Sequence, residues 1–156
     1  MENNLFELDF KNLKKTDIAW LAGLFEGEAY FGLDNRSATR YKVSTSPPAP
    51  YIRISMTDEN VIAKVSKLVN KSYFSPQRLT VTKKQVYICH IGDRSTLKLL
   101  LPLILSYMGL RRQKTILECL KALKDWEGWY LKGGRKKMAS QGSLSKAIKK
   151  KLSTDP

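Results

Sequence analysis

The sequence contains few of the residues that bind transition metals. Its 156 residues include two cysteines, Cys89 and Cys119, and a single histidine, His90. The cysteines do not have the C-x-x-C spacing of zinc sites, and one histidine cannot form a cluster of ligands. The composition therefore argues against a zinc module. It favours an intracellular protein with reduced thiols, in a compartment that the residues do not specify.

A long hydrophobic segment is missing as well. The longest apolar run, Leu97–Met108, is interrupted by Lys98, Pro102 and Ser106. It is much shorter than the roughly 20 residues that a membrane-spanning helix requires. No signal peptide is visible, so we expect no association with a membrane.

Acidic residues are scarce relative to basic ones. The chain has 14 Asp and Glu against 28 Lys and Arg, which gives a formal net charge of +14. Such an excess favours a polyanionic partner such as nucleic acid. The acids gather in residues 1–34, where seven acids accompany three bases. An acidic centre that can bind a metal is thus joined to a basic remainder that can bind phosphates.

The most informative segment is Leu21–Ala29, which reads LAGLFEGEA and falls within a predicted amphipathic helix. Ala19, Gly23 and Gly27 recur every four residues, so they share one stripe of that helix. Each interior glycine costs roughly 1 kcal/mol of helix stability. We infer that the small residues allow another helix to pack closely against the stripe.

Two glutamates near the end of this helix have different expected roles. Glu26 and Glu28 stand two residues apart, so they do not share a helical face. A carboxylate at a helix C-terminus meets the negative end of the helix dipole and needs a cation nearby. Glu28 is therefore a candidate metal ligand.

The segment LAGLFEGEA resembles the signature of the LAGLIDADG homing endonucleases. It has the same first four letters and keeps acids at the sixth and eighth positions, while Ala29 replaces the final glycine. The resemblance implies that the eighth-position acid, Glu28, binds Mg²⁺, with carbonyls near Gly27 and Ala29 as further ligands. Mn²⁺ would substitute for Mg²⁺, and Ca²⁺ would support binding without turnover.

Only one copy of the signature is present, so the resemblance also implies a homodimer. In that family, the small residues let two signature helices pack together at an interface. The corresponding interface residues here are Ala19, Ala22, Gly23 and Gly27.

The hydrophobic patterns after the first helix predict an α+β fold. We expect a helix from Asp17 capped by Thr16, strands over residues 29–36 and 51–56, a helix opening at residues 57–60, a hairpin over residues 78–90, and helices over residues 95–107 and 112–126. Pro102 is expected to kink or divide the first of the last two helices. This is the αββαββα order of the LAGLIDADG family, which implies a saddle-shaped antiparallel sheet with its helices on one face.

One face of the predicted sheet is polar and is expected to meet DNA. Any single residue there is more often just a solvated strand position, but the basic excess favours DNA binding for the set. In the hairpin, Leu79, Val81, Val86 and Ile88 are expected to point inward. The predicted DNA-binding residues are Gly32, Asp34, Arg36, Tyr51, Arg53, Ser55, Arg78, Thr80, Thr82, Gln85, Tyr87, Arg111, Lys136 and Lys137. Among them, Arg36, Arg53 and Arg78 suit guanine, and Asp34 suits the N4 amino group of cytosine.

The family places a basic residue before its last core helix, close to the phosphate that is cut. This chain offers Arg111, Arg112 and Lys114 at that place as cations to stabilise the developing charge. Arg112 is the preferred candidate among the three, and Lys114 is also predicted to be catalytic. A polar residue that positions water in the family is replaced by Met56, and Ser55, Thr57 and Asp58 are the candidate substitutes. Trp126, Trp129 and Tyr130 are expected to pack in the last helix.

The chain is expected to divide into a leader (1–15), an endonuclease domain (16–131) and a basic tail (132–156). Residues 132–151 contain eight bases and no acid, which suits contact with phosphates or simple solubility. The sequence thus predicts a homodimeric, Mg²⁺-dependent homing endonuclease that cuts double-stranded DNA at a long pseudo-palindromic site. The alternatives are an RNA-splicing maturase and a non-cleaving DNA-binding protein of the same fold.

Overall fold

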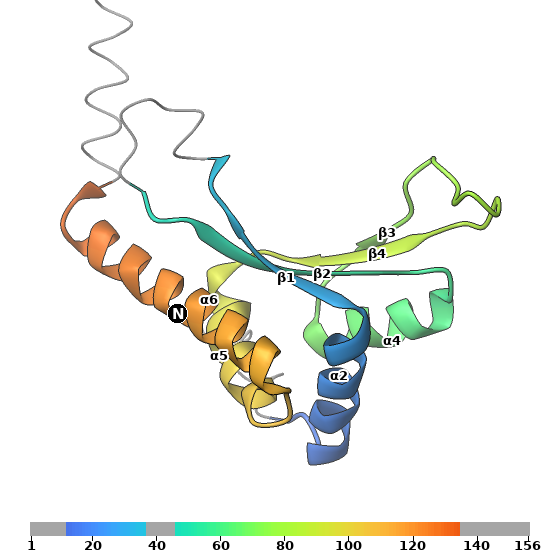
Figure 1. Ribbon diagram of the computed structural model, residues 1–156, viewed down its shortest axis with the longest axis horizontal. Coiled ribbons are helices and arrows are strands. Elements are labelled where there is room, and N and C mark those ends of the chain that lie inside the picture. The colour runs from blue at the N-terminus through green and yellow to red at the C-terminus, as the bar shows by residue number, and fades with distance from the viewer. Residues whose placement is uncertain (1–11, 37–45, 135–156) are drawn as a thin grey trace, which may run out of the picture.

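The computed structural model describes residues 12–36 and 46–134, in which an open antiparallel sheet carries its helices on one face (Figure 1). The elements follow the order α2 (Lys15–Glu28), β1 (Ala29–Asp34), β2 (Ala49–Met56), α4 (Glu59–Val69), β3 (Tyr73–Phe74), β4 (Tyr87–Ile91), α5 (Arg94–Leu105) and α6 (Leu110–Leu131). The α+β class and the predicted αββαββα order are confirmed, with two helices at the end.

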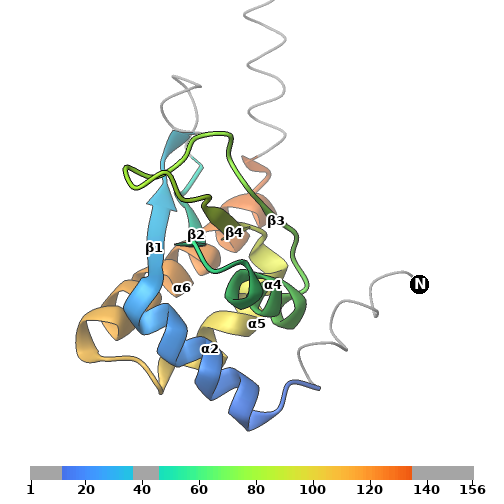
Figure 2. The same cartoon turned by 90° about the vertical axis from the view of Figure 1, so that its right-hand side faces the viewer.

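The sheet has the strand order β1-β2-β4-β3, and all neighbouring strands are antiparallel. Ala29 pairs with Ile54, and Arg53 lies between Tyr30 on β1 and His90 on β4. Because α2 passes directly into β1 (Figure 2), the last residues of the signature helix stand at the start of the sheet.

One continuous core fills the space between the sheet and the helices. Its strand residues include Phe31, Ile52, Ile54, Cys89 and Ile91, and its helix residues include Leu21, Phe25, Ile62, Val65, Leu97, Leu100, Ile104, Ile116 and Leu123. Full burial of an aliphatic side chain contributes about 1.5–3 kcal/mol, so this core accounts for most of the favourable free energy of folding. The opposite face of the sheet has no helical cover among the described residues (Figure 1).

The helix starts follow the expected capping chemistry in α4 but not in α2. The Asp58 side chain accepts the backbone N–H of Asn60 at the start of α4, within the predicted helix opening at residues 57–60. The prediction of Thr16 as the N-cap of α2 is wrong. The helix begins at Lys15 with Lys14 as its cap, because the carbonyl of Lys14 accepts the first helical hydrogen bonds, from Asp17 and Ile18.

The third strand lies earlier in the chain than predicted. Residues 75–86 form a long loop, and the strand β3 is the short segment Tyr73–Phe74. In the loop, the Thr80 hydroxyl accepts the N–H of Lys84 at 3.0 Å, and Lys83 has a left-handed φ of 59°. The turn at Lys83 lies within the span of the predicted hairpin, residues 78–90. These local bonds replace a strand ladder and leave Val81 fully exposed and not inward-facing.

The facing of β4 is the reverse of the prediction. The pairing register puts Ile88 opposite Ser55 on the open face, whereas Tyr87 lies opposite Met56 on the helix-covered face. Tyr87 is half-buried and packs against the core. A shift of one residue moves every side chain of a strand to its other face, so the prediction of Tyr87 as a DNA-binding residue is wrong.

The last two helices differ in detail from the prediction. Pro102 sits on the exposed side of α5 and does not divide it. The helix α6 starts at Leu110 and not at the predicted residue 112, so the basic stretch up to Lys114 occupies its first turns. Within residues 12–36 and 46–134, none of the helices combines the length and the apolar character that a bilayer crossing demands.

Candidate nucleic-acid interface and metal site

Glu28 is the last residue of α2, and its side chain is exposed. Ser55 follows Ile54, the residue paired with Ala29, so Ser55 lies at the same end of the β1–β2 pair as Glu28. Of the three candidate substitutes for the polar residue that Met56 replaces, Asp58 caps α4 with its carboxylate. Ser55 and Thr57 remain exposed there.

A divalent metal at this position would have few ligands from one chain. The described residues contain no group of three or more His, Cys, Asp or Glu that could hold a metal. Mg²⁺ usually keeps several waters and binds one or two carboxylates together with substrate phosphates. The exposed carboxylate of Glu28, with the carbonyls at the end of α2, fits such a site once a second chain or DNA supplies the remaining ligands.

Glu26 and Arg112 join α2 to α6 beside Glu28. The Glu26 carboxylate accepts the backbone N–H of Gly109 at 3.2 Å, and Nη2 of Arg112 donates to the carbonyl of Glu26 at 3.2 Å. Arg112 is half-buried, and its guanidinium carbon lies 5.5 Å from the centre of the Phe31 ring. The other two bases predicted here, Arg111 and Lys114, are exposed on the same helix.

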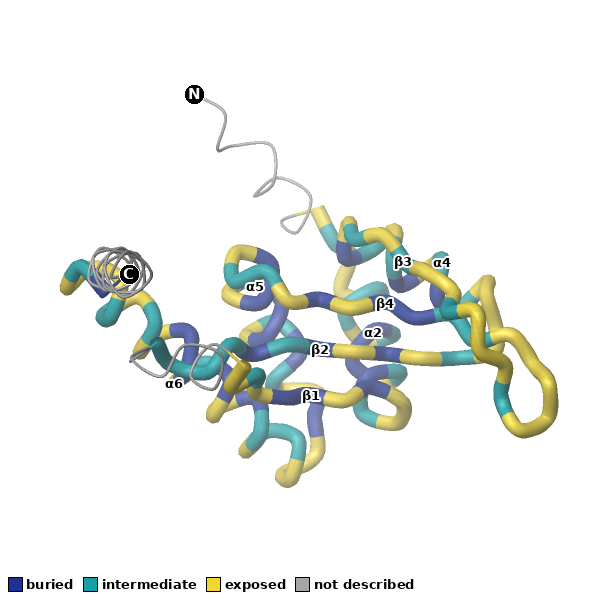
Figure 3. The backbone as a smooth tube through the Cα atoms, turned by 90° about the horizontal axis from the view of Figure 1, so that it is seen from above, coloured by how far each residue is buried: buried dark blue, intermediate teal, exposed yellow. Residues whose placement is uncertain are grey.

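Figure 3 looks onto the open face of the sheet, where exposed and half-exposed positions alternate with buried ones along the strands. The register aligns the side chains of this face in rows across the strands. They are Tyr30, Gly32 and Asp34 on β1, Tyr51, Arg53 and Ser55 on β2, Phe74 on β3, and Ile88 and His90 on β4.

Four of these residues, Tyr30, Phe74, Ile88 and His90, were not predicted from the sequence to lie on this face. Tyr30 has the same phase as Gly32, and continuing the period-two pattern by one step would have found it. His90 was set aside as too isolated to bind a metal, and its strand was given the wrong facing.

Three rings form a stack across the open face. The Tyr51 and His90 rings lie 5.3 Å apart at an interplanar angle of 29°, and Tyr30 approaches Tyr51 at 5.9 Å. The Tyr51 ring lies over Gly32, where an added Cβ would come within 2.6 Å of Cζ of Tyr51. The observed position of the Tyr51 ring therefore depends on glycine at position 32, since any larger residue would displace the ring.

Arg36 and Asp34 form an ion pair at the end of β1. Nε and Nη2 of Arg36 both approach the same Asp34 oxygen, at 2.7 and 2.6 Å. The hydrogen bond from Arg36 lowers the pKa of the Asp34 carboxyl. Both oxygens of the carboxylate that was predicted to accept from cytosine thus accept hydrogen bonds from Arg36. A shallow depression of about 520 Å³ is lined by Leu33, Asp34, Asn35, Arg36, Tyr51, Arg53 and His90.

The electrostatics of the depression keep His90 neutral near pH 7. Partial burial of the ring lowers the pKa of His90, and the positive charges of Arg53 and Arg36 lower it further. Asp34 acts in the opposite direction but is outweighed. A neutral imidazole with one donor and one acceptor nitrogen thus stands among arginines.

The loop over residues 75–86 carries four of the predicted DNA-binding residues, Arg78, Thr80, Thr82 and Gln85. Thr80 and Thr82 share a hydrogen bond between their hydroxyls at 3.0 Å, and the Gln85 amide donates to Ser75. These side chains project from an exposed loop and not from a regular strand.

The small-residue stripe of α2 is exposed. Ala19, Gly23 and Gly27 are all solvent-exposed, and a Cβ added to either glycine would meet nothing within 4 Å. Ala22 differs, because it is fully buried in the core of its own chain. Its assignment to an interface between two chains is therefore wrong.

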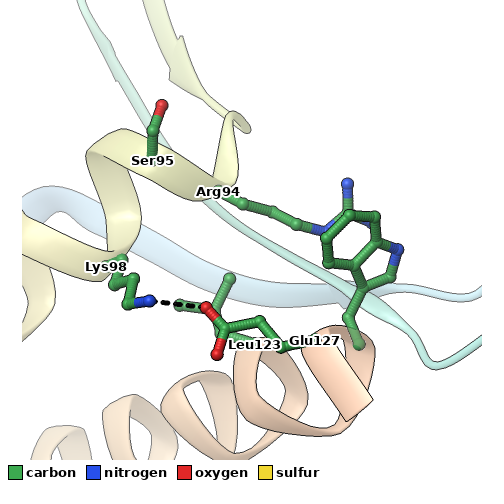
Figure 4. Close-up of a pocket in the computed structure, with 6 residues that line it drawn as sticks. Arg94, Ser95, Lys98, Leu123 and Glu127 are labelled. Atoms are coloured by element: carbon green, nitrogen blue, oxygen red, sulfur yellow. Dashed lines mark hydrogen bonds and ion pairs between the residues drawn. The ribbon is translucent and has the colours of Figure 1, made fainter. Parts of the chain in front are cut away.

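A separate small pocket of about 140 Å³ lies between α5 and α6 (Figure 4). Arg94 stacks over Trp126 at 3.9 Å, and Lys98 pairs with Glu127 at 2.6 Å. Tyr130 stacks on Trp126 at 5.0 Å, as expected for aromatic residues that pack. Two predicted DNA-binding residues, Lys136 and Lys137, lie outside the described residues.

No model of a known protein family matches the sequence, and no curated protein matches it. The structure, however, is similar to solved homing endonucleases. The group I intron-encoded enzyme I-CeuI, complexed with DNA, superimposes with a TM-score of 0.55 at 14% identity, over 77% of this chain and 61% of that chain. The homing endonuclease I-TnaI gives a TM-score of 0.53 at 20% identity, over 81% of this chain and 83% of that chain.

The LAGLIDADG meganuclease I-AabMI, bound to uncleaved DNA, gives a TM-score of 0.51 at 15% identity, over 79% of this chain and 42% of that chain. The chain therefore has the LAGLIDADG homing endonuclease fold, as the nine residues Leu21–Ala29 suggested.

Proposed function

We propose that this protein is a homodimeric, Mg²⁺-dependent endonuclease that cuts double-stranded DNA at one long, pseudo-palindromic site, in the manner of an intron-encoded homing endonuclease. The observation that carries the proposal is the position of Glu28. Its exposed carboxylate ends a helix whose small-residue stripe is uncovered, and it begins the polar face of an open sheet. Metal binding, dimer formation and DNA binding would thus meet at one point.

The sheet face would bind the major groove. An antiparallel sheet that is open on one face can enter the groove, and its side chains can reach base edges. Arg53 and the ion-paired Arg36 suit guanine, while the loop over residues 75–86 extends the surface. The positive charge of the chain outside residues 1–34 would strengthen binding to the phosphates.

The cleavage site would form where two copies of α2 meet. Bound there, Mg²⁺ would polarise the phosphate and lower the pKa of the attacking water. Glu28 of each chain would hold the metal, with the carbonyls near Gly27 and Ala29. Lys114 and Arg111, both exposed, would stabilise the charge that develops on the phosphate. Ser55, at the same end of the β1–β2 pair, would orient water.

The experiment begins with purified protein, Mg²⁺ and a library of randomised duplexes, whose broken ends are sequenced to identify the target. The variant Glu28→Gln is then compared with Glu118→Gln, which neutralises an exposed glutamate on α6. Binding is measured in Ca²⁺ by gel shift, and cleavage is measured in Mg²⁺ over time. We expect Glu28→Gln to bind as well as the wild type while its cleavage falls by several orders of magnitude, and Glu118→Gln to retain both.

Near-wild-type cleavage by Glu28→Gln would refute the proposed mechanism. Specific binding by the wild type without cleavage in Mg²⁺ or Mn²⁺ would indicate a DNA-binding protein that does not cut. Preference for folded RNA over every duplex would support a maturase.

A further inference from the structure

The end of α2 concentrates negative charge. The last carbonyl groups of a helix have no partner within the helix, and the helix dipole is negative there. Glu26 and Glu28 add two carboxylates, and the last turn of α2 contains no basic residue. A stable α2 terminus therefore requires a cation from elsewhere in the fold.

Arg112 supplies that cation from the first turn of α6. Its Nη2 donates to the carbonyl of Glu26 at 3.2 Å, and its guanidinium lies against the Phe31 ring. The Nε atom is buried and has no hydrogen-bond partner among the described residues. A guanidinium held in this way has its reach toward solvent, and toward any phosphate, restricted.

Glu26 completes the connection in the opposite direction. The N-cap of α6 is Gly109, which has no side chain with which to bond the first turn. The Glu26 carboxylate accepts the N–H of Gly109 at 3.2 Å and places negative charge at the positive end of the α6 dipole. An added Cβ on Gly109 would come within 3.2 Å of Oε1 of Glu26, so the fit between the two residues is tight.

We propose that the α2–α6 clasp, formed by Glu26, Gly109 and Arg112, positions the Glu28 carboxylate for the metal, and that Arg112 acts through this clasp without touching the phosphate. Both hydrogen bonds are made by Glu26, two residues before Glu28 in the last turn of the same helix. Each chain thus sets the direction of its own ligand before a second chain or DNA arrives. The inference rests on the proposed metal-dependent cleavage.

The first test compares Gly109→Ala with Gly128→Ala. The former adds a methyl group against Glu26, whereas a Cβ at Gly128, on the same helix, meets nothing within 4 Å. Perturbing a residue that orients a metal ligand costs about 10–100-fold in metal affinity or activity. We expect Gly109→Ala to raise the Mg²⁺ concentration for half-maximal cleavage by about 10-fold. Gly128→Ala should leave it unchanged.

The second test separates positioning from direct catalysis and from general destabilisation. Glu26→Ala should raise the Mg²⁺ concentration needed for half-maximal cleavage. Glu26→Gln keeps an acceptor oxygen for Gly109, so its Mg²⁺ requirement should stay close to that of the wild type. Hydrogen exchange of the Gly109 amide should speed up in Glu26→Ala and stay slow in Glu26→Gln. Arg112→Ala should raise the Mg²⁺ concentration needed for cleavage and should also weaken the binding of Ca²⁺ to the protein–DNA complex.

Three outcomes overturn the inference, and they are distinguishable. A wild type that cuts no duplex removes the proposed function and the clasp's role with it. If the wild type cuts DNA but Gly109→Ala and Gly128→Ala have equal Mg²⁺ requirements, and exchange of the Gly109 amide is unchanged in Glu26→Ala, the clasp alone is refuted. A fall in the cleavage rate of Arg112→Ala at saturating Mg²⁺, without any shift in metal affinity, would make Arg112 a catalytic residue.

Discussion

At the scale of single residues, Arg53 occupies the centre of the open face. Its neighbours across the sheet are Tyr30 and His90, and its side chain is exposed. A guanidinium in that position can form two hydrogen bonds with guanine in the major groove, which would make Arg53 a reader of base identity and not of the phosphate backbone.

Replacing Arg53 should therefore relax sequence preference and leave general affinity largely intact. We expect Arg53→Ala to reduce discrimination at one base position in each half-site by about 1–3 kcal/mol. The measurement is a binding titration over target variants that differ at single positions, with Lys124→Ala on α6 as the charge-matched control. Equal weakening on every sequence would instead identify Arg53 as a phosphate contact.

His90 gives a pH dependence whose sign can be worked out. Its pKa is lowered in the folded chain by burial and by Arg53 and Arg36, whereas an unfolded histidine has a pKa near 6.5. As the pH falls below 6.5, the unfolded chain takes up a proton before the folded chain does, so stability decreases. We expect the melting temperature of the wild type to drop more between pH 7.5 and pH 5 than that of His90→Gln. Equal drops would show that His90 is not the cause.

At the scale of elements, the start of α5 depends on Asp93. Its side chain accepts the N–H of Thr96 at 3.0 Å and pairs with Lys71 at 2.9 Å. Burial raises the pKa of this carboxyl, but hydrogen bonds from Thr96 and Lys71 outweigh that effect and bring the pKa down to about 2.

Removing this cap should destabilise the fold in a pH-dependent way. We expect Asp93→Ala to lower the free energy of unfolding by about 1 kcal/mol at pH 7, the usual value for a lost N-cap. The folded pKa lies below the unfolded one, so the stabilisation is complete above pH 4 and fades as the pH approaches 2. Urea titrations of both proteins at pH 7 and pH 3 measure the difference. A gap that does not narrow at pH 3 would contradict the assignment.

The sequence predicted those elements whose patterns allow one interpretation. In β2, Ile52 and Ile54 alternate with polar residues, and the predicted facing is confirmed. In β4 the residues YICHI place apolar side chains in both phases, so the pattern cannot determine which of them face the helices. The pairing with β2 decides that question, and it is a long-range interaction.

The same limit applies to the basic residues of α6. Arg111, Arg112 and Lys114 are equivalent as letters in a sequence. Their directions depend on the residue at which the helix begins, and a start at Leu110 turns Arg112 toward α2 while Arg111 and Lys114 stay exposed. The first half of the candidate site, Glu28 and its exposed stripe, lay within one helix and was predictable. The second half required the packing of α6 against α2.

At the scale of the whole molecule, the exposed stripe of α2 implies a partner. Two adjacent turns with glycine on the surface give up helix stability and gain no contact within one chain. We therefore expect a second copy of the chain to cover Gly23 and Gly27.

Gly23→Leu tests this assembly. A leucine on the stripe would collide with the facing helix. Overpacking of this kind costs about 1–3 kcal/mol, so dimer affinity should fall by about 5- to 150-fold. Sedimentation equilibrium across a range of concentrations measures the change, with Gly128→Leu, also at an uncrowded helix position, as the control. A compact, active dimer of Gly23→Leu would disprove the interface.

The ring stack above Gly32 has a consequence for anyone who wishes to retarget the protein. Tyr30, Tyr51 and His90 support one another across three strands, and Tyr51 depends on the missing side chain at position 32. Substitutions at these three positions would then not act independently on DNA specificity. Combinatorial libraries should keep Gly32 constant and randomise the three rings together.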